Sequence, residues 1–302
     1  MINDYQILSS EKIDRDKWDR CVDNNDNGLI YAKSIYLDHT APGWKGIVFG
    51  DYDSIFPLCI KRKYGIKYAQ KPVFSQQLGL IGSSDIDFEK LKKIILSQVK
   101  YGDIHFNFFN RNLIGHKTIE RTNFIIDLGK THEHIYKKYK YKLKSDLNKA
   151  STNHLTIVNG EAEETIDAYR RFLLQKTKSI DIKGFRLFTN LCFHEKFKNN
   201  FFVRKVVSSN NTLLASALFL IDRKRIYNIM AITFKQGAEV NAMHFLIDKV
   251  LYEFQQTDLI FDFEGSDLSG VKSFYEKFSP VRQPYYHYHF NYLPFPLNKL
   301  KK

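Results

Sequence analysis

Two different spacings of apolar residues alternate along this chain of 302 residues, and the alternation limits the fold more than any other feature. Segment 201–233 holds apolar runs typical of strands, whereas 161–178 and 243–254 repeat apolar residues every three or four positions, as amphipathic helices do. From residue 155 onward the predicted order is β-α-α-β-β-β-α-β-α-β. Helices interleaved with strands favour an α/β protein over a helical bundle.

The first half is predicted to follow a similar plan. Asp14 or Asp16 caps a short helix, 44–68 reads as strands in a hairpin, a helical pattern begins near Phe88, and 101–128 contains further strands. The segment 131–151 is predicted to be one helix capped by Thr131, and it is the most lysine-rich part of the chain.

The charge of the chain favours an anionic partner. Forty-six basic residues against 33 acidic ones give a formal net charge of +13. Such an excess suits nucleic acid, a nucleotide, a phosphorylated substrate or an acidic membrane surface. A solvated surface rich in lysine is an equally simple explanation, so the charge alone selects no partner.

The three cysteines are far apart and have no C-x-x-C spacing, so neither a disulfide framework nor a zinc site is expected. The first residues do not resemble a signal peptide. The best apolar run, 212–221, is much shorter than the roughly 20 residues of a membrane helix. We therefore expect a reduced, cytoplasmic protein without stable membrane insertion.

The stretch "FDFEGSDLSGVKSFYEKF" (261–278) places two acids in an apolar strand just before a loop and a helix. With a period of two, Asp262 and Glu264 share one strand face, and Phe261 and Phe263 share the other. Ligands of α/β proteins bind beyond the carboxyl ends of strands. Glu264, nearer the end, is the candidate general base for deprotonating an amine. Asp262 is interpreted as structural, since buried strand acids often accept backbone N–H bonds.

This stretch, preceded by "KQGAEVNAMHFLIDKVLYEF", resembles the C-terminal half of GNAT domains in the Fem-type (FemABX) peptidyltransferase group. "RTNFIIDLGKTHEHIYKKYKYKLKSDLNKAS" resembles the segment that links the two halves in that group. The resemblance implies an α/β fold with mixed sheets, built from two GNAT-like halves. We assign residues 1–130 to the first half and 131–302 to the second, which opens with the basic linking helix.

The resemblance also implies a reaction, the transfer of an acyl or aminoacyl group to an amine. The donor is then acyl-CoA or aminoacyl-tRNA. The usual Q/R-x-x-G-x-G/A turn for acyl-CoA is absent in that form, and Gln236-Gly237-Ala238 is the nearest stretch. This departure suits Fem-type members, which use aminoacyl-tRNA.

Gln236, Gly237, Ala238 and Asn241 are therefore the predicted donor-binding residues. Free amides at a helix N-terminus suit a phosphate, and glycine lets the backbone approach a ligand closely. The alternative is an ordinary strand-to-helix turn that needs glycine for local reasons.

The resemblance further implies that Tyr275 protonates the leaving group, with Lys272 one turn away on the same helix. Gln76 and Gln77, in "FSQQLGL", are predicted to hydrogen-bond a substrate in a cleft between the halves, because loops often carry such contacts. For Tyr275 the alternative is a core or surface role. For the glutamines it is a loop that caps its own backbone.

Two further features have simple structural explanations. The lysine-rich helix could follow the phosphates of tRNA or of a nucleotide-linked or lipid-linked substrate, but it also fits a solvated helix face. His287 and His289 share a strand face without a third ligand at a suitable spacing, so no metal site is predicted.

The sequence thus predicts a GNAT-type acyltransferase that acts on an amine, with a cell-wall or nucleotide-linked precursor as a candidate acceptor. No metal is needed for orientation, oxyanion stabilisation and proton removal. The main alternative is a binding or scaffold protein that keeps the fold without catalysis. A third is a nucleic-acid-binding protein driven by charge.

Overall fold

The computed structural model describes residues 4–82, 86–113, 115, 118–176, 181–265 and 267–300. Its contacts divide the chain into two compact units. Unit 1 comprises Met1–Arg121 and Pro284–Lys302, and unit 2 comprises Thr122–Gln283. Each unit is described separately below.

Unit 1 contains two sheets. The strand order of the first sheet is β1 (Tyr5–Ser9), β2 (Lys45–Phe49), β3 (Ser54–Leu58), β6 (Ile81–Gly82). The strand order of the second sheet is β4 (Ile60–Lys63), β5 (Ile66–Ala69), β7 (Tyr101–Phe106), β16 (Tyr285–Asn291), β8 (Thr118–Arg121). Its helices are α1 (Arg15–Asn24), α2 (Ser34–Thr40), α3 (Phe88–Gln98) and α11 (Leu297–Leu300). Short 3₁₀ helices cover Ser10–Lys12, Ile30–Ala32 and Asn110–Leu113.

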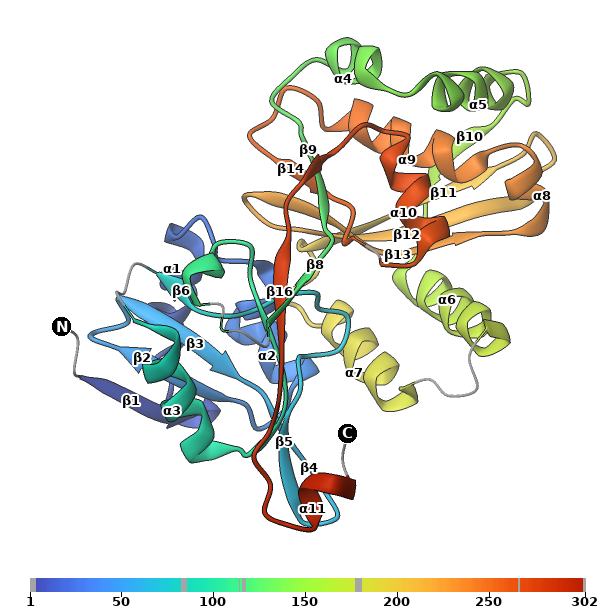
Figure 1. The fold of residues 1–302 in the computed structure, drawn as a ribbon. Coiled ribbons are helices and arrows are strands. Elements are labelled where there is room, and N and C mark those ends of the chain that lie inside the picture. The colour runs from blue at the N-terminus through green and yellow to red at the C-terminus, as the bar shows by residue number, and fades with distance from the viewer. Residues whose placement is uncertain are drawn as a thin grey trace. The chain divides into compact units, whose positions relative to one another are not determined.

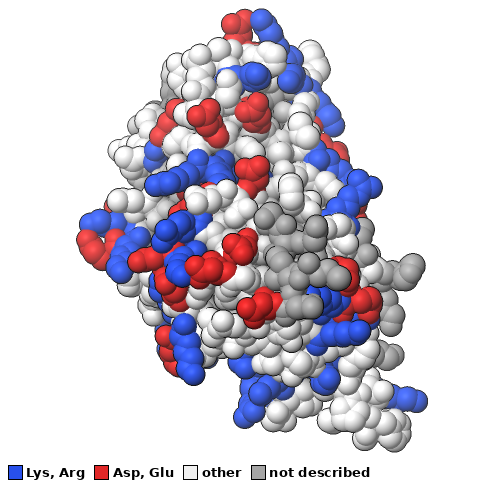
Figure 2. All heavy atoms as spheres, turned by 90° about the vertical axis from the view of Figure 1, so that its left-hand side faces the viewer, with Lys and Arg blue, Asp and Glu red and all other residues white. Residues whose placement is uncertain are grey.

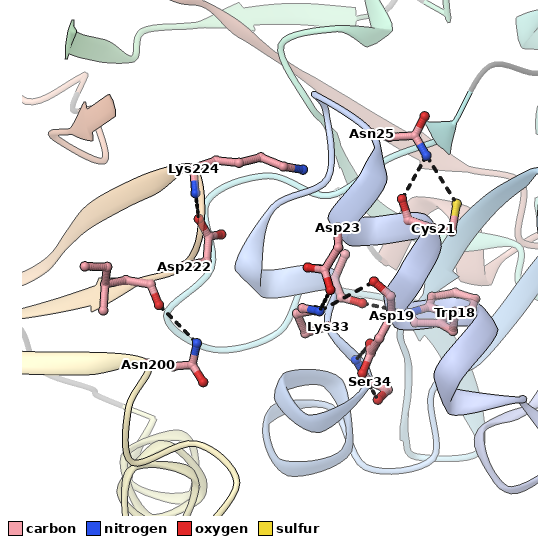
Figure 3. Close-up of polar contacts among 12 residues, drawn as sticks. Trp18, Asp19, Cys21, Asp23, Asn25, Lys33, Ser34, Asn200, Asp222 and Lys224 are labelled. Atoms are coloured by element: carbon pink, nitrogen blue, oxygen red, sulfur yellow. Dashed lines mark hydrogen bonds and ion pairs between the residues drawn. The ribbon is translucent and has the colours of Figure 1, made fainter. Parts of the chain in front are cut away.

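Helix α1 is fixed at its start and along its length by carboxylates. The side chain of Asp14 caps the helix by accepting from the amides of Asp16 and Lys17, as the sequence predicted. Further along, Asp19 accepts hydrogen bonds from the backbone and the hydroxyl of Ser34, and Asp23 pairs with Lys33 (Figure 3). These contacts hold the start of α2 against α1.

Unit 2 is built on one seven-stranded sheet (Figure 1). Its order is β10 (Thr156–Asn159), β11 (Phe201–Val207), β12 (Leu213–Ile221), β13 (Arg225–Thr233), β14 (Ile260–Asp262), β9 (Phe124–Asp127), β15 (Val281–Arg282). Its helices are α4 (His132–Lys138), α5 (Tyr141–Ser151), α6 (Ala162–Lys176), α7 (Ile182–Cys192), α8 (Lys235–Glu239), α9 (Ala242–Glu253) and α10 (Ser269–Glu276).

Helices cover both faces of this sheet. Figure 1 shows α6 on one face and α5 and α9 on the other. The sequence of β12 explains why both faces are covered, since almost all its residues are buried and it has apolar side chains on both faces. Ala215, Ala217 and Phe219 pack into the core with α5 and α9, whereas Ser216 hydrogen-bonds Thr165 of α6. A strand buried on both faces reads as a continuous apolar run.

The contacts divide the chain differently from the boundary predicted at residue 130. Strand β9 lies before that boundary but pairs with β14 and β15 in the sheet of unit 2. Strand β16 lies near the end of the chain but pairs with β7 and β8 in unit 1. Backbone pairing therefore assigns 122–130 to unit 2 and 284–302 to unit 1.

The single helix predicted for 131–151 is wrong, because the segment forms two helices, α4 and α5, with a break at Tyr139 and Lys140. Tyr139 has an extended backbone, with φ −55° and ψ 140°. Its hydroxyl donates to Asp248 of α9, and the Lys140 amide donates to the carbonyl of Lys277. Contacts with other parts of unit 2 therefore outweigh the local helical pattern. The predicted cap, Thr131, does accept from the His134 amide.

A buried ion pair joins β13 to β14. Arg225 Nη1 lies 2.7 Å from Asp262 Oδ2, and the two side chains are 3% and 0% exposed. Asp222 fixes the turn before Arg225 by accepting from the Lys224 amide at 2.8 Å (Figure 3). It also accepts from the Arg225 amide at 2.8 Å.

Replacing only Arg225 should be more damaging than replacing the whole ion pair. Arg225→Met leaves the Asp262 carboxylate buried without its cation and should lower the free energy of unfolding by about 3–5 kcal/mol. The double variant Arg225→Met/Asp262→Leu should recover much of that loss, because apolar groups often replace a buried pair at little cost. Urea denaturation measures both. A double variant no more stable than Arg225→Met would contradict this account.

Candidate functional site

The sheet of unit 2 opens between β13 and β14. The two strands run parallel and pair only from Arg225–Ile260 to Tyr227–Asp262. Strand β14 ends there, whereas β13 continues to Thr233. One edge of β13 therefore loses its strand partner beyond Tyr227, at the carboxyl ends of a parallel pair, where ligands of α/β sheets bind.

A β-bulge on β13 lies directly beside this opening. Leu218 of β12 faces Met230, but the next residue, Phe219, faces Asn228, so Ile229 is the extra residue. A bulge takes the extra residue out of the regular ladder and redirects nearby groups. It therefore reorients the backbone of β13 at the point where β14 has ended.

Glu264 does not share a strand face with Asp262, contrary to the prediction, because β14 ends at Asp262. Glu264 has a φ of +60° and Gly265 a φ of +41°, so the chain turns sharply here. The turn is held by Asp262 Oδ1, which accepts from the Glu264 amide at 2.9 Å. Asp262 thus has the structural role that the sequence favoured, and Glu264 leaves the plane of the sheet.

The environment of Glu264 favours the uncharged carboxyl group. The residue is half-buried, and burial raises the pKa of its carboxyl group well above the usual range. A carboxylate with a raised pKa is a stronger base than one in water, which is the property that a general base for an amine requires.

Tyr275 of α10 lies near Glu264, so the structure brings together the two residues predicted to be catalytic. Burial raises the pKa of the Tyr275 hydroxyl, and the charges of Tyr169, Glu264 and Asp262 raise it further. Hydrogen bonding from the Asn228 side chain opposes part of this shift. The hydroxyl therefore stays protonated and can donate a proton.

Sequence reasoning missed two polar residues of this site, Asn228 and Tyr169. Asn228 is 4% exposed, and its Oδ1 has no hydrogen-bond partner in the described structure. A buried unpaired carbonyl oxygen is costly in a native core unless a ligand or water satisfies it. The signal was present in "RIYNIMAIT", where one amide interrupts an apolar strand. Tyr169, on α6, had no comparable signal.

A pocket of about 650 Å³ lies between α6 and the end of β13. Ile232, Thr233, Phe234 and Lys235 line one side, and charged and aromatic residues of α6, including Arg171 and Phe172, line the other. Gly237 and Glu264 are not among its lining residues. The pocket thus follows the part of β13 beyond β14 and ends just before the predicted donor-binding turn.

The geometry of that turn favours the alternative, local reason for its glycine. Residues 235–239 form the short helix α8, and the Ala238 amide already donates to the Phe234 carbonyl. A Cβ on Gly237 would lie 1.9 Å from the Leu214 carbonyl oxygen. Gln236 and Ala238 are exposed, and Asn241, with φ +57°, precedes α9 without capping it through its side chain. Packing of α8 on β12 therefore explains Gly237.

The predicted substrate-binding glutamines are used within unit 1. Gln77 is 0% exposed; its Oε1 accepts from the Phe108 amide and its Nε2 donates to Gln76, which is also buried. Gln77 therefore has a structural contact, but the backbone group that it caps lies after β7 and not in its own loop. Lys272 is half-buried on α10, one turn before Glu276.

The lysine-rich segment formed by α4 and α5 makes some of its ion pairs within unit 2. Lys142 and Lys277 both pair with the buried Asp146, at 3.0 and 3.2 Å. Lys138, Lys140 and Lys149 are exposed, and no carboxylate pairs with them in the part of the chain that the structure describes. These three are the segment's cations open to an external anion.

The two strand histidines share one carboxylate. His287 Nε2 and His289 Nδ1 lie 2.7 and 3.0 Å from Asp103 Oδ1. In the described ranges, no three His, Cys, Asp or Glu side chains gather closely enough to hold a metal ion. All three cysteines are buried free thiols.

Comparison with solved structures shows the fold. FemX superposes with a TM-score of 0.67 at 12% identity, over 98% of this chain and 99% of that one. L-PGS from Bacillus licheniformis gives 0.55 at 13% identity, over 95% of both chains. Saccharomyces cerevisiae N-myristoyltransferase with bound myristoyl-CoA gives 0.50 at 12% identity, over 98% of this chain and 85% of that one. No family model matches the chain, and a search of curated proteins finds no match.

These neighbours have GNAT-like folds with two lobes. The predicted fold class, a mixed α/β protein of two GNAT-like halves, is therefore confirmed. At these identities the likeness concerns the fold, and the site residues rest on the geometry given above.

A test of Gly237 follows from the contact with Leu214. Gly237→Ala should lower the free energy of unfolding by about 1–3 kcal/mol, because a backbone oxygen occupies the position of the new methyl group. The matched control is Gly270→Ala in α10, where the added Cβ meets no atom within 4 Å. That control should be stabilised by about 0.5–1 kcal/mol. Chemical denaturation measures both, and equal effects of the two changes would contradict the packing explanation.

Proposed function

We propose that this chain transfers an acyl or aminoacyl group to an amine, and that the reaction takes place where β13 and β14 separate in unit 2. The observation that carries the proposal is the grouping of Glu264, Tyr275 and Asn228 at the carboxyl ends of a parallel strand pair. A base, a proton donor and an unpaired polar acceptor in one enclosed place match the requirements of acyl transfer.

Each of the three groups has a role in this proposal. Glu264 removes a proton from the incoming ammonium group, and Asn228 Oδ1 accepts a hydrogen bond from an N–H of the same amine. The amine nitrogen then attacks the carbonyl carbon of the donor. The backbone N–H groups at the Ile229 bulge are the proposed donors to the oxyanion that forms.

The tetrahedral intermediate collapses as the bond from carbon to the leaving sulfur or oxygen breaks. Tyr275 donates its proton to that leaving atom and is reprotonated through Glu264. The balance is one amide formed, one thioester or ester broken and one proton released. The raised pKa values of both groups support this assignment: the ionised carboxylate of Glu264 is then a stronger base, and the Tyr275 hydroxyl keeps its proton until the leaving atom takes it.

The pocket beside the end of β13 is the proposed donor site. Thr233 lies six positions after Tyr227, which is roughly 20 Å along a strand. A donor that reaches from Lys235 to Glu264 is therefore long and extended. Acyl-CoA has that form, and the N-myristoyltransferase neighbour was solved with myristoyl-CoA. Aminoacyl-tRNA stays the second donor, with the exposed lysines of α4 and α5 as its phosphate contacts.

The acceptor is an amine, with cell-wall and nucleotide-linked precursors as candidate classes, and the cytoplasm is the proposed location. Among the described residues, no helix combines the length and apolar composition needed to cross a bilayer.

The second candidate function is a GNAT-fold binding or scaffold protein without turnover. The specific observation in its favour is the predicted donor turn, where Gly237 packs on Leu214 and the Ala238 amide is bonded within α8. Donor binding separates the two candidates.

Donor binding is tested by thermal unfolding of the whole chain with acetyl-CoA, long-chain acyl-CoA and charged tRNA. The account predicts that an acyl-CoA raises the melting temperature by a few degrees, because a ligand at 100 times its Kd stabilises by about 2.7 kcal/mol. Lys235→Glu, at the pocket, should reduce the rise, whereas Lys149→Glu on α5 should not. No rise with any of the three donors would favour the scaffold function.

The role of Glu264 is tested by its own effect on stability, which requires no known substrate. A carboxyl group whose pKa is raised by folding destabilises the folded state as pH rises from its unfolded pKa, about 4.3, towards the folded value. Glu264→Gln removes this cost. The variant should therefore be more stable than the wild type at pH 8 and equal to it below about pH 4.

The same variant should keep donor binding and lose turnover, by roughly 10²–10⁴-fold for a general base. If Glu264 served only the structure, Glu264→Gln would be less stable than the wild type at pH 8. Denaturation at both pH values measures the difference.

A further inference from the structure

Unit 1 contains a groove whose charged lining residues are all basic. It has a volume of about 280 Å³ and lies between the β4–β5 hairpin, the end of α3 and Leu293. Its charged lining residues are Arg62, Lys67 and Lys100, and all three are exposed. Ile66, Val99 and Leu293 supply apolar walls. A groove of this composition suits an anionic group attached to an apolar body.

The hairpin sets two of these cations against each other. Arg62 of β4 lies directly opposite Lys67 of β5 in the antiparallel register. Like charges at directly opposed positions are destabilising. No carboxylate pairs with either residue in the described part of the chain. An external anion bound between these two exposed cations would relieve their repulsion.

Two exposed aromatic residues lie next to the groove's lining residues in the sequence, Tyr64 beside Gly65 and Phe295 two positions after Leu293. Tyr64, at the tip of the hairpin, is 88% exposed, and Phe295 is 76% exposed. Lys63 lies over the Tyr64 ring and Lys299 over the Phe295 ring, at 5.4 and 6.0 Å. We call this set, together with Arg62, Lys67 and Lys100, the hairpin surface.

Lysine on an edge strand also prevents sheet-to-sheet aggregation, and β4 is an edge strand. That explanation covers the lysines of the hairpin but not the exposed Tyr64 and Phe295, which would themselves promote association. Figure 2 shows Lys, Arg and uncharged residues over the lowest part of the drawn face, at the level of β4, β5 and α11 in Figure 1. Protection of the edge strand by charge repulsion therefore explains the lysines of the hairpin surface but not its exposed aromatic residues.

We propose that the hairpin surface binds the anionic phospholipid surface of a membrane. Arg62, Lys67 and Lys100 would contact lipid phosphates, and Tyr64 and Phe295 would enter the boundary between headgroups and acyl chains, where aromatic side chains are favoured. The aromatic residues select a membrane over nucleic acid, because they lie on a protruding hairpin tip and a terminal segment rather than inside the basic groove. The binding is peripheral and reversible, and it is independent of the proposed reaction.

Vesicle co-sedimentation of the full chain tests the proposal. The wild type should bind vesicles of phosphatidylcholine with about 30% phosphatidylglycerol at about 0.1 M salt and should bind pure phosphatidylcholine far more weakly. Arg62→Glu/Lys67→Glu should reduce the partition coefficient at least about 25-fold, since each basic residue at an anionic surface contributes roughly fivefold. Tyr64→Ser/Phe295→Ser should also weaken binding, although its charge is unchanged.

The matched control is Lys138→Glu/Lys149→Glu, which makes the same change of charge on α4 and α5 of unit 2 and should bind nearly as the wild type does. Equal losses in the two charge variants would reduce the effect to net charge and overturn the proposal. Wild-type binding by Tyr64→Ser/Phe295→Ser would overturn it as well. So would binding of an RNA hairpin that Arg62→Glu/Lys67→Glu abolishes while vesicle binding persists, because the surface would then serve nucleic acid.

Discussion

The ion pair between Arg225 and Asp262 is the interaction on which the candidate site depends. It joins β13 to β14 at the end of their parallel pairing. The second carboxylate oxygen of Asp262 accepts from the Glu264 amide and thereby sets the turn that takes Glu264 out of the strand. Asp262, interpreted from the sequence as a structural residue, thus positions its neighbour. Its charge is neutralised by Arg225, and the environment of Glu264 is shaped by burial.

The sequence was informative where local pattern and fold agree. Alternating periods predicted the α/β class, and the acid-bearing strand before a glycine led to Glu264. Tyr275, which the resemblance implied, lies near Glu264. The order β13, α9, β14, α10 follows from short-range patterns of apolar residues. The short helix α8 was predicted only as a turn, since Gly237 is its one buried residue. Helix caps such as Asp14 and Thr131 were readable for the same reason.

Features set by distant contacts were not readable. Tyr139 ends α4 because its hydroxyl reaches Asp248 of α9, more than 100 residues later. Gly237 is required by the carbonyl of Leu214 on another strand, and the pairing of β16 with β7 joins residues almost 200 positions apart. A period of two placed Glu264 on a strand face, but its positive φ depends on the Asp262 carboxylate. Strand register and turn geometry therefore determine features that the spacing of apolar residues could not predict.

The pKa of the Glu264 carboxyl group, followed by carbon NMR across a pH titration of the whole chain, tests the central claim most directly. The account predicts a midpoint well above the ordinary value of about 4.3, and a change in that midpoint when Tyr275 is replaced by phenylalanine. A midpoint near the ordinary value, unmoved by Tyr275→Phe, would contradict it. Glu264 would then be a solvated surface acid with no shared site.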